Sequence, residues 1–238
     1  MTFLDDIIRR SYASLRGTGL DADLRTADIV RIAVRRVPEL ARGAASRRWW
    51  QGERGTLWRG PRVSLVGRSR IMLGPGVVLG EGVHINGMSH LGVSLGRNAT
   101  VGRQASILGS GTMATLGMGV TVGERSAIGA GNVVWGQGGV TIGDNVLMGP
   151  YVVVVSANHG FRDLAVPIRE QAETYGPVII EDDCWIGAGA TLLAGSHVGR
   201  GSVVAAGSVV RGAFPPNSIL GGVPARILGD RAEGEAPD

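Results

Sequence analysis

The sequence predicts an all-β solenoid, a parallel β-helix preceded by an α-helical N-terminal extension, and three observations predict it. Aliphatic residues recur every six positions over most of the chain. Glycine is unusually frequent, at 40 of 238 residues, yet there is no Gly-X-Y period and 44% of the residues are hydrophobic, which excludes collagen and simple disorder. The first sixty residues lack this period and instead place their apolar residues at helical spacing.

Residues 1–60 are predicted to form a helical segment. Two groups of residues recur at helical spacing: Leu4, Ile7 and Ile8, and then Ile29, Ile32, Ala33, Arg36 and Val37. They predict two helices joined by the loop RGTGLDAD. We expect Pro38 to end or kink the second helix, because proline cannot donate a backbone hydrogen bond.

The two ends of the solenoid carry different signals. The stretch RRWWQGERGTLWRGPR, residues 47–62, leads into the first coil, and its arginines with Trp49 and Trp50 suit either an anionic membrane surface or the open end of a solenoid. We favour capping and keep membrane contact as the alternative. Residues 215–238 are predicted to form a C-terminal cap and a disordered tail, since RAEGEAPD is polar and without pattern.

The six-residue period defines the β-helix, which we place at residues 61–214. The aliphatic positions are Leu73, Leu79, Ile85, Leu91, Leu95, Val101, Ile107, Leu116, Val122, Ile128, Val134, Ile142, Met148, Val154, Ile180, Ile186, Leu192, Val198, Val204 and Val210. Six is a whole number of strand alternations, so one short strand and one turn close each unit, and three units make a coil of about eighteen residues. The crossover rule for parallel strands predicts a right-handed coil.

Composition and charge restrict the classes of function. All basic side chains are arginine, and 24 of them against 20 acids give a net charge of +4, which suits phosphate-bearing ligands or solubility. We expect no nucleic-acid partner. One cysteine cannot form an intrachain disulfide, and the acidic start MTFLDDIIRR is unlike a signal peptide. No stretch reaches the roughly eighteen apolar residues of a membrane-spanning helix, so a cytoplasmic protein is expected.

The longest interruption of the period is VVVVSANHGFRDLAVPIREQ, residues 152–171. It predicts a functional loop, residues 157–177, that carries charged side chains which the coil strands lack. His159 begins this loop, and an imidazole can take a proton from an alcohol near neutral pH, so His159 is a candidate general base. The other histidines, His84, His90 and His197, are expected at the surface of the coil.

Four motifs, taken with the hexapeptide pattern, resemble one family. ANHGFRD, PVIIEDDCWIGAGATLLAG, AAGSVVRGAFPPNSI and GGVPARIL are similar to motifs of the hexapeptide-repeat acyltransferases, and the resemblance covers about residues 61–228. It implies a left-handed coil, against the crossover rule. It also implies an acetyl-CoA-dependent O-acetyltransferase, of the branch that acetylates sugars and polysaccharide precursors by direct transfer without a metal.

The same resemblance implies a homotrimer with active sites between subunits, in which His159 matches the catalytic histidine. Three residues match positions that line the pantetheine arm of acetyl-CoA, namely Gly187, Ala188 and Ala206. Trp185 is expected to pack beside that arm.

Two arginines are expected to contact the phosphates of acetyl-CoA. Arg226 matches the basic residue that reaches the 3′-phosphate, and arginine suits this contact through bidentate hydrogen bonds. SVVRGAFPPN departs from the commoner SVVTKDVPPN, with Arg211 in place of Thr and Gly212 in place of Lys. We therefore expect the phosphate-binding cation to have moved one position, to Arg211.

The acceptor pocket has four candidate residues, Asn132, Trp135, Gln137 and Asn158, because an aromatic face and amide groups suit a sugar ring. Asn132 stands in a slot that the period gives to small residues, where a polar amide needs a hydrogen-bonding partner. That partner is either the acceptor or the corner of the coil, and the sequence leaves both open. The sequence does not identify the acceptor itself.

Three alternatives remain. Cys184 could form an acyl-cysteine intermediate, but it occupies a small-residue slot and is expected to pack inside the coil. A zinc-dependent carbonic anhydrase-like enzyme needs three converging histidines, whereas His84 and His90 are expected on different faces. A non-catalytic β-helix scaffold would need a flat, Thr-rich face and gives His159 no role.

Overall fold

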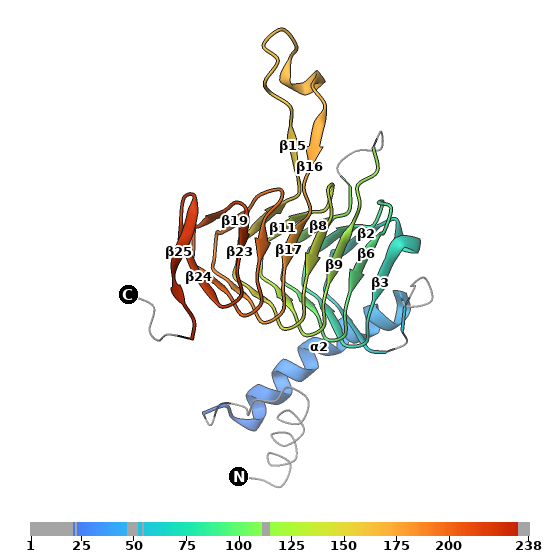
Figure 1. The fold of residues 1–238 in the computed structure, drawn as a ribbon. Coiled ribbons are helices and arrows are strands. Elements are labelled where there is room, and N and C mark those ends of the chain that lie inside the picture. The colour runs from blue at the N-terminus through green and yellow to red at the C-terminus, as the bar shows by residue number, and fades with distance from the viewer. Residues whose placement is uncertain (1–20, 22, 47–51, 54, 111–114, 233–238) are drawn as a thin grey trace.

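The computed structural model shows a left-handed parallel β-helix in which the strands of successive coils stack into three sheets (Figure 1). The structure describes residues 21, 23–46, 52–53, 55–110 and 115–232. Sheet 1 contains β1 (Leu57–Arg59), β4 (Val77–Leu79), β7 (Thr100–Val101), β10 (Ala127–Ile128), β13 (Leu147–Met148), β18 (Trp185–Ile186), β21 (Val203–Val204), β24 (Ser218–Gly222) and β25 (Ala225–Asp230).

The other two sheets complete each coil. Sheet 2 contains β2 (Ser64–Val66), β5 (His84–Asn86), β8 (Ser106–Leu108), β11 (Val133–Trp135), β14 (Val153–Val155), β19 (Thr191–Leu192) and β22 (Val209–Val210). Sheet 3 contains β3 (Ile71–Leu73), β6 (Val93–Leu95), β9 (Val120–Val122), β12 (Val140–Ile142), β17 (Val178–Ile180), β20 (His197–Val198) and β23 (Ala213–Phe214). The chain therefore visits sheets 1, 2 and 3 in turn and crosses three corners in every coil.

The left-handed coil confirms what the family resemblance implied, and the right-handed coil expected from the crossover rule is wrong. That rule depends on a connection long enough to carry a helix, whereas most corners here are short turns. Residues at the corner between sheets 3 and 1 adopt left-handed backbone conformations, with φ of 58° at Asn98, 57° at Asn145 and 58° at Asp183. The conformations of these turns, and not a packed helix, direct the chain into the next coil.

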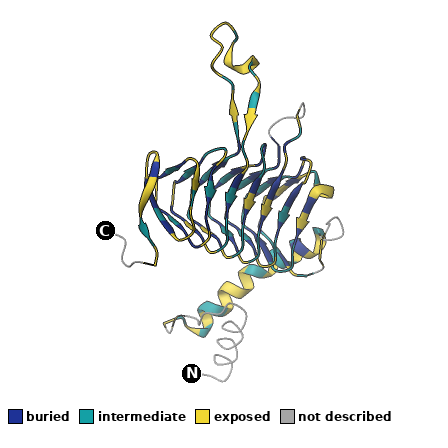
Figure 2. Cartoon of the chain, viewed as in Figure 1, coloured by how far each residue is buried: buried dark blue, intermediate teal, exposed yellow. Residues whose placement is uncertain are grey.

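The aliphatic positions of the period form one continuous core inside the coil, drawn dark blue in Figure 2. Leu91 and Leu116 are exceptions, since Leu91 is 69% exposed and Leu116 is half-buried. Both lie in insertions between sheet 2 and sheet 3, where Val93 and Val120 begin the next buried strands. The interruptions of the period thus fall at one corner of the triangular coil, the corner between sheets 2 and 3. The other two corners keep the six-residue spacing.

The N-terminal extension contains α2 (Thr26–Ser46), which packs against β1. The Arg42 Nε donates to the Arg59 carbonyl at 2.9 Å, and the Arg36 guanidinium lies 5.4 Å from the centre of the Trp58 ring. Pro38 lies inside the helix and does not end it, and Arg42, one turn after the proline, is tied to β1. The first predicted helix, together with Trp49 and Trp50, lies outside the described residues.

At the opposite end, β24 and β25 form an antiparallel hairpin that closes sheet 1. Arg231 ties this hairpin to the body through the Asp183 carboxylate and the Gly201 carbonyl, both at 2.9 Å. The end of the predicted tail, residues 233–238, lies outside the described residues. In the described part of the chain, no helix combines the length and apolar character needed to cross a bilayer.

Two further features leave the regular coil. A single 3-10 turn, η2 (Arg68–Arg70), follows β2 at the corner between sheets 2 and 3. At the same corner a hairpin formed by β15 (Ala157–His159) and β16 (Glu173–Tyr175) stands away from the body, with a second 3-10 turn, η3 (Ile168–Glu170), near its tip (Figure 1). This projecting hairpin corresponds to the predicted loop and carries His159.

Candidate functional site

The projecting hairpin holds His159 at its base, close to the coil. β15 and β16 pair antiparallel, and the Gly176 N–H donates to the Ser156 carbonyl at 3.0 Å to close the base. Thr174 and Tyr175 favour an extended strand. His159 and Glu173 are direct partners across this ladder. The histidine is therefore positioned by a paired strand, which restrains it more than a free loop would.

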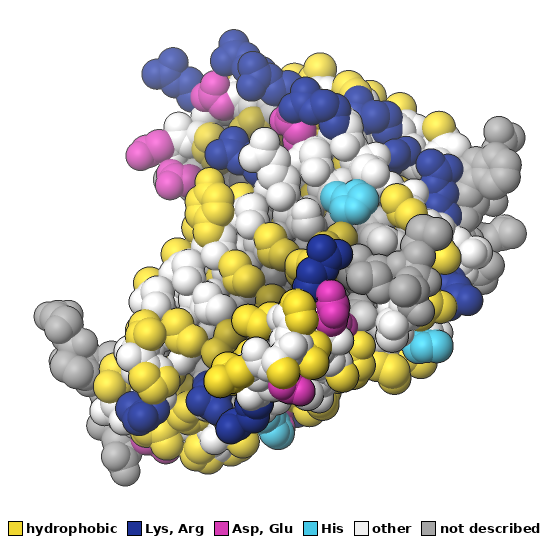
Figure 3. Space-filling model, turned by 90° about the horizontal axis from the view of Figure 1, so that it is seen from above, with side chains coloured by type: hydrophobic (Ala, Val, Ile, Leu, Met, Phe, Trp, Pro, Cys, Tyr) yellow, Lys and Arg dark blue, Asp and Glu magenta, His cyan; other side chains and the backbone are white. Residues whose placement is uncertain are grey.

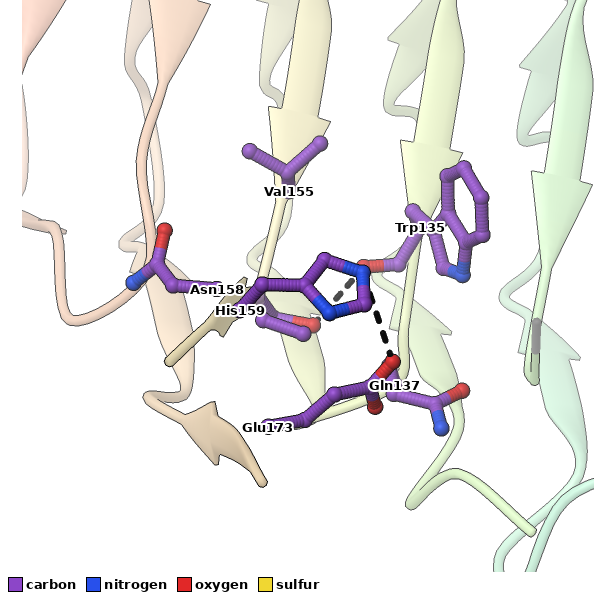
Figure 4. Close-up of a pocket in the computed structure, with 8 residues that line it drawn as sticks. Trp135, Gln137, Val155, Asn158, His159 and Glu173 are labelled. Atoms are coloured by element: carbon purple, nitrogen blue, oxygen red, sulfur yellow. Dashed lines mark hydrogen bonds and ion pairs between the residues drawn. The ribbon is translucent and has the colours of Figure 1, made fainter. Parts of the chain in front are cut away.

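Three of the four predicted acceptor residues line one pocket with His159. The pocket has a volume of about 220 Å³ and is lined by Trp135, Gln137, Val155, Ser156, Ala157, Asn158, His159 and Glu173. Figure 4 shows the His159 ring between Val155 and the Glu173 carboxylate, with Trp135 contributed by the neighbouring coil. The wall is mostly apolar and carries a few polar groups, as is common in sites for small molecules.

The neighbouring coil fixes the wall of this pocket. The Ser156 Oγ donates to the Trp135 carbonyl at 2.7 Å and accepts from the Gly138 N–H at 2.9 Å. The Gln137 Nε2 donates to the Thr115 carbonyl at 3.4 Å, which links the pocket to the insertion after β8. These bonds join strands far apart in sequence and keep the pocket wall in place.

A carboxylate faces the histidine. The Glu173 Oε1 lies 3.8 Å from the His159 Nε2, and the Tyr175 Oη donates to the Glu173 Oε2 at 3.0 Å. The His159 side chain is 57% exposed and the Glu173 side chain 29%. The imidazole is thus open to a ligand while its partner is the more buried of the two.

A larger groove lies along the other side of the hairpin. Its volume is about 730 Å³, and it is lined by Asn158, His159, Gly160, Phe161, Arg162, Gln171, Thr174, Leu193, Ala194 and Arg211. Arg211 follows β22, two coils beyond the strand that leads into the hairpin. His159 therefore borders two hollows, a small apolar pocket and a groove that carries two arginines.

One of the acceptor predictions, Asn132, needs correction, and the orientation of a second, Asn158, is informative. Asn132 is fully buried, and its Oδ1 accepts the Val152 N–H at 2.8 Å, so it serves the corner of the coil and cannot touch an acceptor. Asn158 lines the pocket, but its amide points away from the His159 ring, as expected for adjacent residues of a strand (Figure 4). Trp135, Gln137 and Asn158 line the pocket, and of these the Gln137 amide is buried and held by the Thr115 carbonyl.

The predicted acetyl-CoA residues lie elsewhere on the same chain. Trp185, Gly187, Ala188 and Ala206 are at or beside the corner between sheets 1 and 2, whereas His159 is at the corner between sheets 2 and 3. Ala188 and Ala206 are exposed, and Gly187 is buried. Arg226 is exposed on β25. One chain therefore does not bring this wall and His159 together, although it does bring Arg211 to the groove.

The structure also places the candidate nucleophile, Cys184, and the candidate metal ligands. Cys184 is 1% exposed inside the coil, where burial raises the pKa of its thiol and disfavours the thiolate needed for attack. Among the described residues, no three His, Cys, Asp or Glu side chains gather in an arrangement that could bind a metal ion. The histidines visible from above in Figure 3 lie apart from one another.

Two residues of the site, Glu173 and Tyr175, were not predicted from the sequence to act with His159. They lie more than ten residues after His159, and only the antiparallel pairing of β15 with β16 brings them together. Alternating polar and β-favouring residues in ETY could have predicted a returning strand. The register that places Glu173 opposite His159 has no local signal.

Comparison with known proteins gives consistent matches. A family model described as bacterial transferase hexapeptide (six repeats) matches residues 177–212. A probable acetyltransferase of Mycobacterium tuberculosis is 33% identical over 174 residues, which is 73% of this chain and 56% of the relative. Galactoside O-acetyltransferase of Escherichia coli is 38% identical over 90 residues, covering 37% of this chain and 43% of the relative.

A putative lipopolysaccharide biosynthesis O-acetyl transferase of Escherichia coli is 35% identical over 96 residues, covering 37% of this chain and 49% of the relative. The chain spans about half the length of the curated relatives it matches. A solved structure of an AntD mutant, an N-acyltransferase from Bacillus cereus in complex with dTDP and coenzyme A, superimposes with a TM-score of 0.55 at 24% identity, over 67% of this chain and 83% of that one. This likeness supports the β-helix fold.

Proposed function

Because the chain belongs to the hexapeptide-repeat acetyltransferase family, we propose that it transfers an acetyl group from acetyl-CoA to a hydroxyl of a sugar or polysaccharide precursor, with His159 as general base. One observation carries this proposal above the others. His159 stands between the small apolar pocket and the larger groove, so one imidazole can meet an acceptor on one side and a thioester on the other.

The small pocket suits the acceptor. Trp135 offers a partly exposed aromatic surface that can hold one face of a sugar ring. Gln137 is buried and its amide donates to the Thr115 carbonyl, so it supports the wall behind that surface. The relatives named for galactoside and lipopolysaccharide O-acetylation support a hydroxyl acceptor. A hydroxyl held beside the His159 ring is within reach of proton transfer.

The groove suits acetyl-CoA. Leu193 and Ala194 provide a smooth wall for the pantetheine arm, and Arg211 offers a cation for its phosphates. We extend the proposal to a homotrimer, in which Ala188 and Ala206 of one copy complete the groove beside His159 of the next. This arrangement explains why the predicted wall and the base lie on different corners of one chain.

The reaction then proceeds by direct transfer. His159 takes the proton of the acceptor hydroxyl while its oxygen attacks the carbonyl carbon of the thioester. The tetrahedral intermediate collapses, the C–S bond breaks, and CoA leaves as a thiolate that receives the proton from His159. The acetyl ester and free CoA are the products, and no step draws on Cys184 or on a metal ion.

The test measures CoA release from acetyl-CoA with a panel of neutral glycosides, lipid-linked glycans, nucleotide sugars and amino sugars. We expect His159→Ala to lower kcat/KM by about 10²–10⁴-fold, because it removes the general base. Calorimetry should show nearly unchanged acetyl-CoA binding. His90→Ala is the matched control, since His90 is also exposed but lies away from the hairpin.

Several outcomes would contradict the proposal. Full activity of His159→Ala would show that His159 is not the general base. No CoA release with any acceptor would favour a scaffold, and stoichiometric zinc would favour an anhydrase-like enzyme. Products that hydroxylamine does not cleave would be amides and would replace O-acetylation with N-acetylation, since esters are cleaved under the same conditions.

A further inference from the structure

We propose that Glu173 is the positioning residue for His159, and that it fixes the proton on Nε2 so that Nδ1 is the basic nitrogen. This inference rests on the proposed function and deepens it. It follows from the hairpin, where the two side chains are direct cross-strand partners and the His159 Nε2 lies 3.8 Å from the Glu173 Oε1. Figure 4 shows the carboxylate turned toward the ring.

The cross-strand register makes this contact specific. Side chains of directly opposed residues lie on the same face of a two-stranded sheet, so the register of β15 and β16 keeps Glu173 on the face of His159. Shifting β16 by one residue would turn Glu173 to the other face of the hairpin. Pairing on both sides, Ala157 with Tyr175 and Asn158 with Thr174, opposes such a shift.

The surroundings of Glu173 keep its carboxylate available to the ring. Among the described residues, the ion pairs of Glu173 involve His159 alone, although Arg162 and Arg169 belong to the same hairpin. Its second oxygen accepts the Tyr175 hydroxyl at 3.0 Å. Tyr175 therefore holds one oxygen while the other faces the imidazole, and no arginine of the described residues pairs with either.

The chemistry of this arrangement is directional. A carboxylate accepts hydrogen bonds only, so the nitrogen that faces it is the protonated one in a neutral imidazole. Nδ1 then carries the lone pair that takes the hydroxyl proton. After that transfer the imidazolium lies beside a negative charge, which stabilises it. Glu173 takes no proton in this scheme, and the proton passes from Nδ1 to the departing CoA thiolate.

The distance suits a partner that tightens during the reaction. A separation of 3.8 Å is longer than a hydrogen bond, and such contacts often shorten when ligands bind. The His159 side chain is more than half exposed, so a bound acceptor would displace water from one side and press the ring toward Glu173. Glu173 thereby contributes to the chemical step without touching the acceptor's reacting oxygen.

The experiment compares Glu173→Gln, Glu173→Ala and Glu173→Asp with the wild type. We expect Glu173→Gln and Glu173→Ala to lower kcat by about tenfold to a hundredfold, less than His159→Ala, because the base remains but is no longer held. The KM for acetyl-CoA should change by less than twofold. Glu173→Asp should recover part of the loss, and millimolar formate should partly restore Glu173→Ala. Glu170→Gln, in the same hairpin, is the matched control.

A spectroscopic readout separates positioning from mere support of the hairpin. With ¹⁵N-labelled histidine, the His159 signals should report a proton on Nε2 in the wild type and a mixture of tautomers in Glu173→Gln, with His159→Gln used to assign them. An unchanged tautomer together with unchanged kcat in Glu173→Gln would overturn this inference. If His159→Ala keeps its activity, the proposed function fails instead; if only the Glu173 variants keep theirs, the proposed function stands without this residue.

Discussion

Several buried polar side chains along the coil accept a backbone N–H of a neighbouring coil. The Ser126 Oγ accepts the Val146 N–H at 2.9 Å, and the Ser202 Oγ accepts the Ser218 N–H at 3.0 Å. The Asn132 Oδ1, on a longer side chain, likewise accepts the Val152 N–H. A buried N–H without a partner costs free energy, so these residues stabilise the coil where the strand ladder is interrupted at a corner.

The hydrogen bond of Asn132 should contribute to stability and not to acceptor binding. We expect Asn132→Ala to lower the free energy of unfolding by about 1–3 kcal/mol, because it leaves the Val152 N–H buried without an acceptor. The KM for the acceptor should not change, since Asn132 does not reach the pocket. Urea denaturation and steady-state kinetics check both parts, with the exposed Asn158→Ala as a stability control. A raised acceptor KM with unchanged stability would return Asn132 to the site.

The sequence identifies the chemistry of a side chain better than its position in the fold. Trp135 and Gln137 were predicted as acceptor residues because aromatic and amide groups suit a sugar, and both line the pocket. Asn132 has the same chemistry but is enclosed by the coil. Glu173 was missed because its role depends on a strand register, which arises from pairing over a distance and not from its neighbours in sequence.

Among the structural elements, the turn between sheets 1 and 2 shows two different uses of glycine. A Cβ at Gly102 would lie 2.6 Å from the Ala130 backbone nitrogen of the next coil, so that position requires glycine for space. Gly189 has a φ of +67°, and a Cβ there would meet nothing within 4 Å. Tyr151 occupies the equivalent turn position one coil earlier with a φ of 58°, so this position tolerates a side chain.

This contrast predicts two different results for substitution. Gly102→Ala should destabilise the protein by about 1–3 kcal/mol, because the methyl group must push two stacked coils apart. Gly189→Asn should change stability by less than about 1 kcal/mol, since asparagine tolerates left-handed backbone conformations. Urea midpoints of the two variants measure the difference. Equal losses would mean that backbone conformation, and not the spacing of the coils, decides which turn positions need glycine.

The six-residue period predicts the strands of the coil but not the insertions between them. The six-residue period predicted the core strands because each strand repeats the same contact with its neighbour one coil away. It failed at Leu91 and Leu116, where insertions at the corner between sheets 2 and 3 add residues that the coil does not bury. The hairpin of β15 and β16 belongs to the same corner, and its antiparallel pairing follows no six-residue period.

For the whole molecule, the three corners of the prism determine how copies can assemble. The proposed groove places His159, at the corner between sheets 2 and 3, against Ala188 and Ala206 of another copy, at the corner between sheets 1 and 2. In a closed ring of three prisms, two corners of each copy border grooves and the third lies nearest the axis. The third corner joins sheets 3 and 1, so these sheets should face the neighbouring copies and sheet 2 should face solvent.

The outward residues of sheet 1 agree with this arrangement. Leu147 and Trp185 are neighbours in the ladder of sheet 1, and they are 57% and 56% exposed in the single chain. Neighbouring large apolar residues that are this exposed are typical of surfaces covered by a partner. On sheet 3 the short side chains of Thr121 and Thr141 point outward and would allow a second sheet to approach closely.

The oligomeric state in solution tests this geometry. We expect the wild type to sediment with the mass of three chains, and Leu147→Arg or Thr141→Arg to dissociate it, because an arginine in a packed interface is left without a partner. Ser106→Arg, on sheet 2, should leave the trimer intact. Activity should fall with the mass, since each proposed groove needs two copies.

Co-assembly of inactive His159→Ala with inactive Ala188→Trp should restore part of the activity, because some grooves then combine an intact base with an intact wall. Dissociation by Ser106→Arg alone, or an active monomer, would contradict the arrangement.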